Sequence, residues 1–316
     1  MTATVDDGRP SEDDPGPQGV APARILDRGY RAYTGVRLGA RGSVQALTLH
    51  TVQGVLGLKR SFWNKVLPGL TIFLAYVPAI VFVGIATFLK SRLIARGVDI
   101  NDVIPSYGDY YLFVWAAIGV FVAFVAPEAL CTDRRTGMLG MYLASPLRRD
   151  TYLLAKAAAI AFVLSIVTLG PPLLMLVART IAGVGPDGPG GVLAVLWRVI
   201  VAGVVVGLLP TTLSLAVAST TTRRAVASAA IVLILLGSIA VSESLIAAGA
   251  SHSFFALNLV YLPVELVVRL YGEPAGTSLS SATGVATSTL VVVYVALTAA
   301  LAVFVRTRYQ RIQVTR

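Results

Sequence analysis

The chain has 316 residues, of which 56% are hydrophobic and 13% are charged. A soluble domain carries about 25% charged residues, so this composition excludes a soluble globular protein and indicates an integral membrane protein. The net charge of +10 does not predict nucleic-acid binding, because the basic residues stand at the ends of apolar segments, where membrane orientation explains them. A single cysteine (Cys131) and two distant histidines (His50 and His252) argue against metal chemistry.

Residues 1–42 predict a disordered cytoplasmic tail. The stretch MTATVDDGRPSEDDPGPQGVAPA is acidic, rich in Pro and Gly, and too poor in large apolar residues to offset the entropy of ordering. It lacks the basic start and the apolar stretch of a secretory signal. The N-terminus is therefore expected to stay in the cytoplasm.

Residues 43–67 predict an amphipathic helix that lies in the membrane interface. A helical wheel places a set of apolar residues on one face and polar residues on the other. The apolar set is Val44, Leu47, Val55, Leu58, Phe62 and Val66.

Six segments reach the length of about twenty residues that a hydrocarbon core requires. These spans are expected near 68–89, 111–130, 152–178, 193–219, 225–248 and 283–305. Basic residues concentrate in alternate connections and in the tail 307–316, so both termini are predicted to be cytoplasmic. The expected fold is an all-α membrane protein with a six-helix transmembrane domain over 68–306.

A seventh apolar stretch, FFALNLVYLPVELVVRLYG at 254–272, lies between the fifth and sixth spans. Pro263 interrupts it, and Glu265 and Arg269 would sit deep in lipid if it spanned. A central charge costs about 2.5–3.5 kcal/mol on insertion scales. We therefore expect residues 253–274 to form an outer helical segment that is interfacial or re-entrant.

Ionisable residues are missing from the middle of all six predicted spans. Ion-driven carriers place such residues inside the membrane as relays or ligands, so the driving force is expected to enter at a cytoplasmic surface. The chain has no G-x-x-x-x-G-K-[ST] motif. The G-x-G-x-x-G match at Gly183, Gly185 and Gly188 falls in a Pro-rich connection without a preceding strand. No catalytic residue, cofactor or metal site is expected, and ATP and Mg²⁺ would bind to a partner chain.

The stretch GYRAYTGVRLGARGSVQALTLHTVQGVLGLKRSFWNKVLPGL is similar to the N-terminal portion of actinobacterial permeases of ABC-2 type transporters. The stretch APEALCTDRRTGMLGMYLASPLRRDTYLLAKAAA, residues 126–159, resembles permease subunits of these transporters, in particular the NosY-like branch. In that family it follows the second transmembrane helix. The matching residues are Pro127, Glu128, Asp133, Arg134, Gly137, Tyr142, Leu143, Ser145, Pro146, Leu147, Arg149, Tyr152, Leu153 and Lys156.

The resemblance implies that residues 131–151 form a cytoplasmic coupling loop that docks on a separate ATP-binding subunit. It also implies a second permease subunit, identical or related, and export of an amphiphilic or hydrophobic substrate such as a drug, lipid or metabolite. The location would be the bacterial cell membrane. The loop residues expected to couple ATP hydrolysis are Asp133, Arg134, Arg135, Gly137, Met138, Met141, Tyr142, Ser145, Pro146, Arg148, Arg149 and Asp150.

The chemistry of this loop fits docking. Asp133 is expected to cap a short helix, which Ser145-Pro146 would end, and Asp150 is expected to cap the third span. Methionine and tyrosine side chains at 138, 141 and 142 offer adaptable apolar contacts. The four arginines would pair with acidic groups of the partner or with anionic lipid headgroups.

Other residues have two interpretations each. Glu128 would pair with Arg134 or Arg135, or act on substrate, and Glu243 would reach the outer headgroups or line a gate. Pro171, Pro172 and Pro210 would kink the third and fourth spans, and these kinks would serve either as hinges of a gate or transport path or for packing alone. Gly203 and Gly207 permit a close helix contact, such as one between two subunits.

Two other classes of function remain open. An ion-coupled secondary transporter or a channel would need an ion site in the spans. A membrane-embedded enzyme or a scaffold subunit would need a catalytic cluster or a stable partner that is not an ATPase.

Overall fold

The computed structural model describes residues 39–58, 61–89, 105–144, 146–183, 185–272 and 284–311, together with Arg92, Ala95 and Gly97. Within these residues every regular element is helical. The α-helices are α1 (Gly39–Val55), α2 (Trp63–Gly84), α5 (Tyr110–Val120), α6 (Glu128–Arg135), α7 (Met138–Ala144), α8 (Arg149–Ile181), α9 (Gly188–Ala218), α10 (Arg224–Ala247), α11 (Tyr261–Tyr271) and α12 (Thr287–Arg311). Two π-helical turns, Ile85–Leu89 and Phe121–Val125, and one 3₁₀ helix, His252–Leu257, complete the set.

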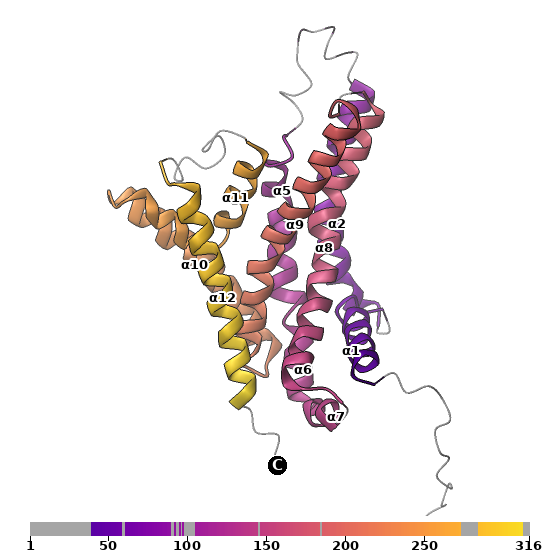
Figure 1. Cartoon of the computed structure of the whole chain (residues 1–316), viewed down its shortest axis with the longest axis vertical. Coiled ribbons are helices and arrows are strands. Elements are labelled where there is room, and N and C mark those ends of the chain that lie inside the picture. Colours follow the sequence, from indigo (N-terminus) through magenta and orange to yellow (C-terminus); the bar gives the residue numbers. More distant parts are fainter. Residues whose placement is uncertain are drawn as a thin grey trace, which may run out of the picture. The chain divides into compact units, whose positions relative to one another are not determined.

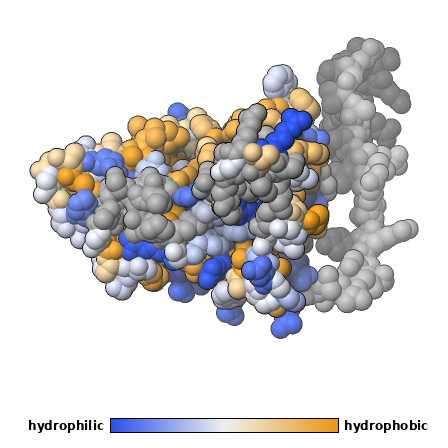
Figure 2. Space-filling model, turned by 90° about the horizontal axis from the view of Figure 1, so that it is seen from above, coloured by the Kyte–Doolittle hydropathy of each residue, from blue (hydrophilic) through white to orange (hydrophobic). Residues whose placement is uncertain are grey.

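Six of these helical segments are long and apolar enough to cross a membrane, which confirms that part of the predicted fold. They are Trp63–Gly84, Tyr110–Arg135, Arg149–Ile181, Gly188–Ala218, Arg224–Ala247 and Thr287–Arg311. Their length and number indicate a multi-pass membrane protein. Apolar side chains are exposed on the flanks of the described helices, as the view from above also shows (Figure 2).

Helix α8 has 33 residues and is about 50 Å long at 1.5 Å per residue. It packs against α1, α2 and α9 (Figure 1). Gly203 of α9 allows a close approach to α8, since a Cβ atom there would lie 2.0 Å from Cδ2 of Leu169. Gly207 faces Leu164 of the same helix. The predicted close helix contact at Gly203 and Gly207 is therefore found between two helices of one chain.

The second span contains the π-helical turn Phe121–Val125 between α5 and α6. A π turn changes the hydrogen-bond pattern of a helix and leaves carbonyl groups in need of other donors. Ser214 of α9 supplies one, because its hydroxyl donates to the carbonyl of Val122 at 3.0 Å. The span continues as a helix to Arg135, five residues beyond its predicted end.

The predicted interfacial helix 43–67 is divided in the structure. Helix α1 begins at Gly39, inside the predicted tail, and ends at Val55, while α2 begins at Trp63. Gly57 has a φ of 67°, and a Cβ atom there would lie 2.7 Å from the carbonyl oxygen of Asn64. Only glycine fits this turn, so one continuous helix is wrong. The rest of the predicted tail, residues 1–38, lies outside the described residues.

Substitution of Gly57 by alanine is expected to destabilise the fold, whereas Gly54→Ala is expected to preserve or slightly raise stability. The left-handed backbone costs an L-residue about 1–2 kcal/mol, and the clash with Asn64 adds to this. Gly54 lies three residues earlier inside α1 with open space around it, where alanine gains up to about 1 kcal/mol. Thermal unfolding of the two variants in detergent measures the difference, and equal midpoints would contradict the assigned turn.

The seventh apolar stretch forms the 3₁₀ helix His252–Leu257 and the 11-residue helix α11. At 1.5 Å per residue α11 is about 16 Å long, too short to span a bilayer. Glu265 is 1% exposed and pairs with Arg269 at 2.7 Å. Arg269 also donates to the carbonyl of Val285 and the hydroxyl of Thr287 at the start of α12. The two charges that argued against a span are thus paired with each other.

Candidate functional site

The residues of the predicted coupling loop 131–151 are mostly helical. Helix α6 ends at Arg135, a turn at Thr136 and Gly137 follows, and α7 covers Met138–Ala144. Gly137 has a φ of 69°, the left-handed conformation that a turn between two helices uses. Ser145 lies outside the described residues, and Pro146 follows the end of α7 as expected. Figure 1 shows α6, α7, the start of α8 and the end of α12 at one end of the bundle; we call this the α6–α7 end.

A buried ion pair holds the α6–α7 end together. Nζ of Lys156 in α8 lies 2.7 Å from Oδ2 of Asp133 in α6, and the two residues are 3% and 8% exposed. The hydroxyl of Tyr152 donates to the same oxygen at 2.8 Å. Asp133 lies inside α6, so the prediction that it caps a short helix is wrong. Its carboxylate instead joins the end of the second span to the third.

Two tyrosine rings lie beside Lys156, and a third packs on one of them. The ring of Tyr152 lies 5.9 Å from that of Tyr142 in α7 and 6.0 Å from that of Tyr309 in α12, between centroids. Lys156 Nζ is 5.8 Å and 5.7 Å from the ring centroids of Tyr142 and Tyr152, within the range of cation–π attraction. Burial and the charge of Asp133 raise the pKa of Tyr142. The Tyr142 phenol is therefore neutral at physiological pH.

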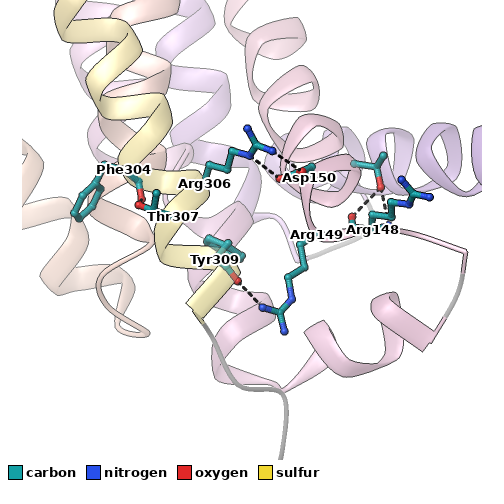
Figure 3. A network of polar contacts seen from close by, with 8 residues as sticks. Arg148, Arg149, Asp150, Phe304, Arg306, Thr307 and Tyr309 are labelled. Atoms are coloured by element: carbon teal, nitrogen blue, oxygen red, sulfur yellow. Dashed lines mark hydrogen bonds and ion pairs between the residues drawn. The ribbon is translucent and has the colours of Figure 1, made fainter.

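The C-terminal end of α12 contacts the start of α8 (Figure 3). Tyr309 is 1% exposed, and α12 runs to Arg311. The expected tail 307–316 therefore begins as a packed helix, with residues 312–316 outside the described part of the chain. The guanidinium of Arg149 donates to the carbonyls of Tyr309, at 3.2 Å, and Gln310. These bonds satisfy carbonyl groups that the last turn of a helix leaves open.

Asp150 and Arg306 form a more exposed pair between α8 and α12. Nε and Nη2 of Arg306 donate to the two carboxylate oxygens of Asp150, each at 3.2 Å (Figure 3). Asp150 lies in the first turn of α8, while Arg148 occupies the cap position and exchanges hydrogen bonds with Thr151. The prediction that Asp150 caps the third span is therefore wrong, although a carboxylate in the first turn still stabilises the helix dipole.

Glu128 and Arg134 have partners that differ from the expected ones. Glu128 pairs with Arg224 at the start of α10, at 2.8 Å, rather than with Arg134 or Arg135. Arg224 also donates to the carbonyl of Phe124. Arg134 donates to the carbonyls of Ser219 and, at 3.2 Å, Thr221, after the end of α9. Both arginines thus tie the second span to the α9–α10 connection.

The residues left on the surface form a smaller set than the predicted loop. Arg135, Thr136, Gly137, Met141, Ala144, Pro146 and Arg148 are exposed, with Met141 at 68%. Met141 and Ala144 are three residues apart and share a face of α7. Met138 and Tyr142 are half-buried against the bundle. We call the exposed residues Arg135, Met141, Ala144 and Arg148 the exposed α7 surface; two of them are apolar and lie in α7, and two are cations in the segments on either side of it.

The remaining predicted residues lie elsewhere. Glu243 is half-buried near the C-terminal end of α10, four residues before Ala247. Pro171 and Pro172 are buried within α8, and Pro210 is buried within α9. Helices α8 and α9 are each continuous through these prolines. The described residues contain no group of three or more His, Cys, Asp or Glu side chains that could hold a metal ion.

Asp133 and Tyr142 are candidates from the sequence, whereas Lys156, Tyr152 and Tyr309 have no predicted role there. Contacts between α6, α8 and α12 bring these three residues together. A signal was present for two of them, because Tyr152 and Lys156 belong to the stretch 126–159 on which the resemblance rests. Tyr309 lies in a basic segment and carried no such signal. No protein-family model matches the chain, and no curated protein matches it.

Proposed function

We propose that the chain is the transmembrane subunit of an ATP-driven ABC exporter and that the exposed α7 surface docks on a separate ATP-binding subunit. The observation that carries the proposal is the contact of α7 with a cluster of side chains that joins three spans. Tyr142 packs on Tyr152 of the third span, Tyr152 and Lys156 bind Asp133 of the second span, and Tyr309 of the sixth span packs on Tyr152. A displacement of α7 by a partner would therefore move these spans together.

The charge distribution supports a cytoplasmic position for the α6–α7 end. Arginines concentrate near cytoplasmic membrane boundaries in multi-pass proteins. Those near this end are Arg134, Arg135, Arg148, Arg149, Arg223, Arg224, Arg306, Arg308 and Arg311. In this proposal both termini are cytoplasmic, the location is the bacterial plasma membrane, and two permease subunits, identical or related, form the transport path. The substrate class is an amphiphilic or hydrophobic molecule.

The proposal is tested by measuring ATP hydrolysis in the complex purified from the native membrane in mild detergent. The expected result is Mg²⁺-dependent ATPase activity that purifies with the full chain, although the chain has no P-loop. ATP-dependent accumulation of substrate in inside-out vesicles is expected as well. If a monodisperse and otherwise intact preparation shows no ATPase activity, the proposal is contradicted.

A proton-coupled carrier is the second candidate, and one cavity favours it. A space of about 40 Å³ next to the buried pair is lined by His50, Glu128, Asp133 and Lys156, among others. Titratable groups that face a shared space are typical of proton relays. Transport by the isolated chain in liposomes, driven by a pH gradient without ATP, would support the carrier and contradict the exporter.

A further inference from the structure

A groove of about 440 Å³ opens between α8, α9 and α12 near the α6–α7 end. Its walls are aliphatic apart from the hydroxyl of Thr212. They consist of Leu153, Leu154, Ala157, Thr212, Leu215, Ala302 and Val305. The Asp150–Arg306 ion pair also lines the groove. The groove is thus apolar along its length and charged at one end.

The groove has the position of a site for a lipid chain. Asp150 and Ala157 are seven residues apart on α8, which corresponds to about 10 Å along the helix. All three helices belong to segments that are long and apolar enough to cross the membrane. Water in an aliphatic groove at this depth would lack hydrogen-bond partners, whereas a hydrocarbon chain meets only apolar atoms. The groove therefore fits an acyl chain that enters from the adjacent leaflet.

The charged residues at one end of the groove determine which lipid headgroup can bind there. Arg306 and Asp150 side chains are 62% and 47% exposed, and an exposed pair of this kind contributes about 0.2–1 kcal/mol. A ligand oxygen can replace the carboxylate at little cost. Arg306 is the cation that lines the groove beside Asp150, whereas the Arg149 guanidinium binds the carbonyls of Tyr309 and Gln310. Basic pockets between transmembrane helices bind acidic headgroups.

We propose that this groove binds one acyl chain of an anionic phospholipid, whose phosphate contacts Arg306 in exchange for Asp150. This lipid site does not depend on ATP-driven transport, so the two proposals are tested independently of each other.

The apolar part of the site is tested by filling it. Ala157→Trp places an indole in the groove, and Ala158→Trp places the same group one residue further along α8, at an exposed position outside the lining residues. Native mass spectrometry of the full chain, titrated with phosphatidylglycerol, measures the bound fraction. We expect at least about fivefold weaker binding for A157W and parental binding for A158W. Equal binding by A157W and the parent would overturn the proposal.

The charged part is tested with a second matched pair on α12. Arg306→Gln removes the proposed phosphate ligand, and Arg308→Gln removes an exposed arginine two residues away. We expect R306Q, but not R308Q, to lose the preference for phosphatidylglycerol over phosphatidylcholine. R306Q also keeps the proposal testable if A157W fails to fold. Equal binding of both lipids by the parent chain would show that headgroup charge does not select the ligand and would overturn the proposal. A change of A157W from dimer to monomer with no change in lipid binding would show instead that a second copy of the chain occupies the groove.

Discussion

Replacing Lys156 with methionine is expected to destabilise the fold by about 3–5 kcal/mol, because it leaves the carboxylate of Asp133 buried without its cation. Asp133 is 8% exposed and lies 2.7 Å from Lys156 Nζ. The hydroxyl of Tyr152 would still donate to the carboxylate, but one neutral hydrogen bond does not replace the lost charge. The midpoint of thermal unfolding in detergent, followed by circular dichroism, measures the effect.

Two further variants separate charge burial from general disruption. The double variant Asp133→Leu with Lys156→Met removes both charges, and it is expected to recover most of the lost stability, less about 1–3 kcal/mol for the unpaired hydroxyl of Tyr152. Arg306→Met breaks the exposed pair with Asp150 and is expected to cost less than about 1 kcal/mol. If K156M lowers the midpoint no more than R306M does, the ion pair does not hold the α6–α7 end together.

Met141→Asp is expected to weaken binding of the ATP-binding subunit by about 30-fold and to reduce the ATPase activity of the purified complex accordingly. A buried apolar anchor at an interface contributes about 2 kcal/mol or more, and a carboxylate in its place would be desolvated without a partner. Met141 is 68% exposed in the single chain, so this substitution leaves the packing of the bundle unchanged. Titration of the ATP-binding subunit onto the purified chain gives the affinity.

Met141→Leu is the matched control, because it keeps the apolar surface and is expected to retain parental affinity and activity. Met138 and Tyr142 are less suitable positions, since both are half-buried and Tyr142 packs on Tyr152. An aspartate at either position would also disturb the bundle. Full ATPase activity and parental affinity in M141D would show that α7 is not the docking element.

The six spans could be predicted because continuous apolar runs of about twenty residues have few other stable structures. Their ends could not be predicted from hydropathy. Helix α8 begins at Arg149 and α12 continues to Arg311, since a helix that crosses a membrane also extends into the polar region. The division between α1 and α2 had a sequence signal in Gly57, because glycine commonly ends helices in the left-handed conformation.

The partners of charged residues were harder to predict than the residues themselves. Asp133 was a candidate from the sequence, but its partner Lys156 is 23 positions later and becomes adjacent only through packing of α6 on α8. Arg134 and Arg149 bind backbone carbonyls. Because every residue carries a carbonyl, such partners cannot be identified from the residue types in the sequence. The groove between α8, α9 and α12 likewise depends on three helices that are distant in the chain.

The proposed docking is tested most directly by determining which side of the membrane α7 faces. A single cysteine introduced as Met141→Cys, in a chain whose buried Cys131 is replaced by serine, reacts with a membrane-impermeant maleimide wherever that reagent reaches it. Labelling is expected in inside-out vesicles, and none is expected in intact cells. Labelling of Met141→Cys in intact cells would place the α6–α7 end outside and would contradict the proposed docking on a cytoplasmic ATP-binding subunit.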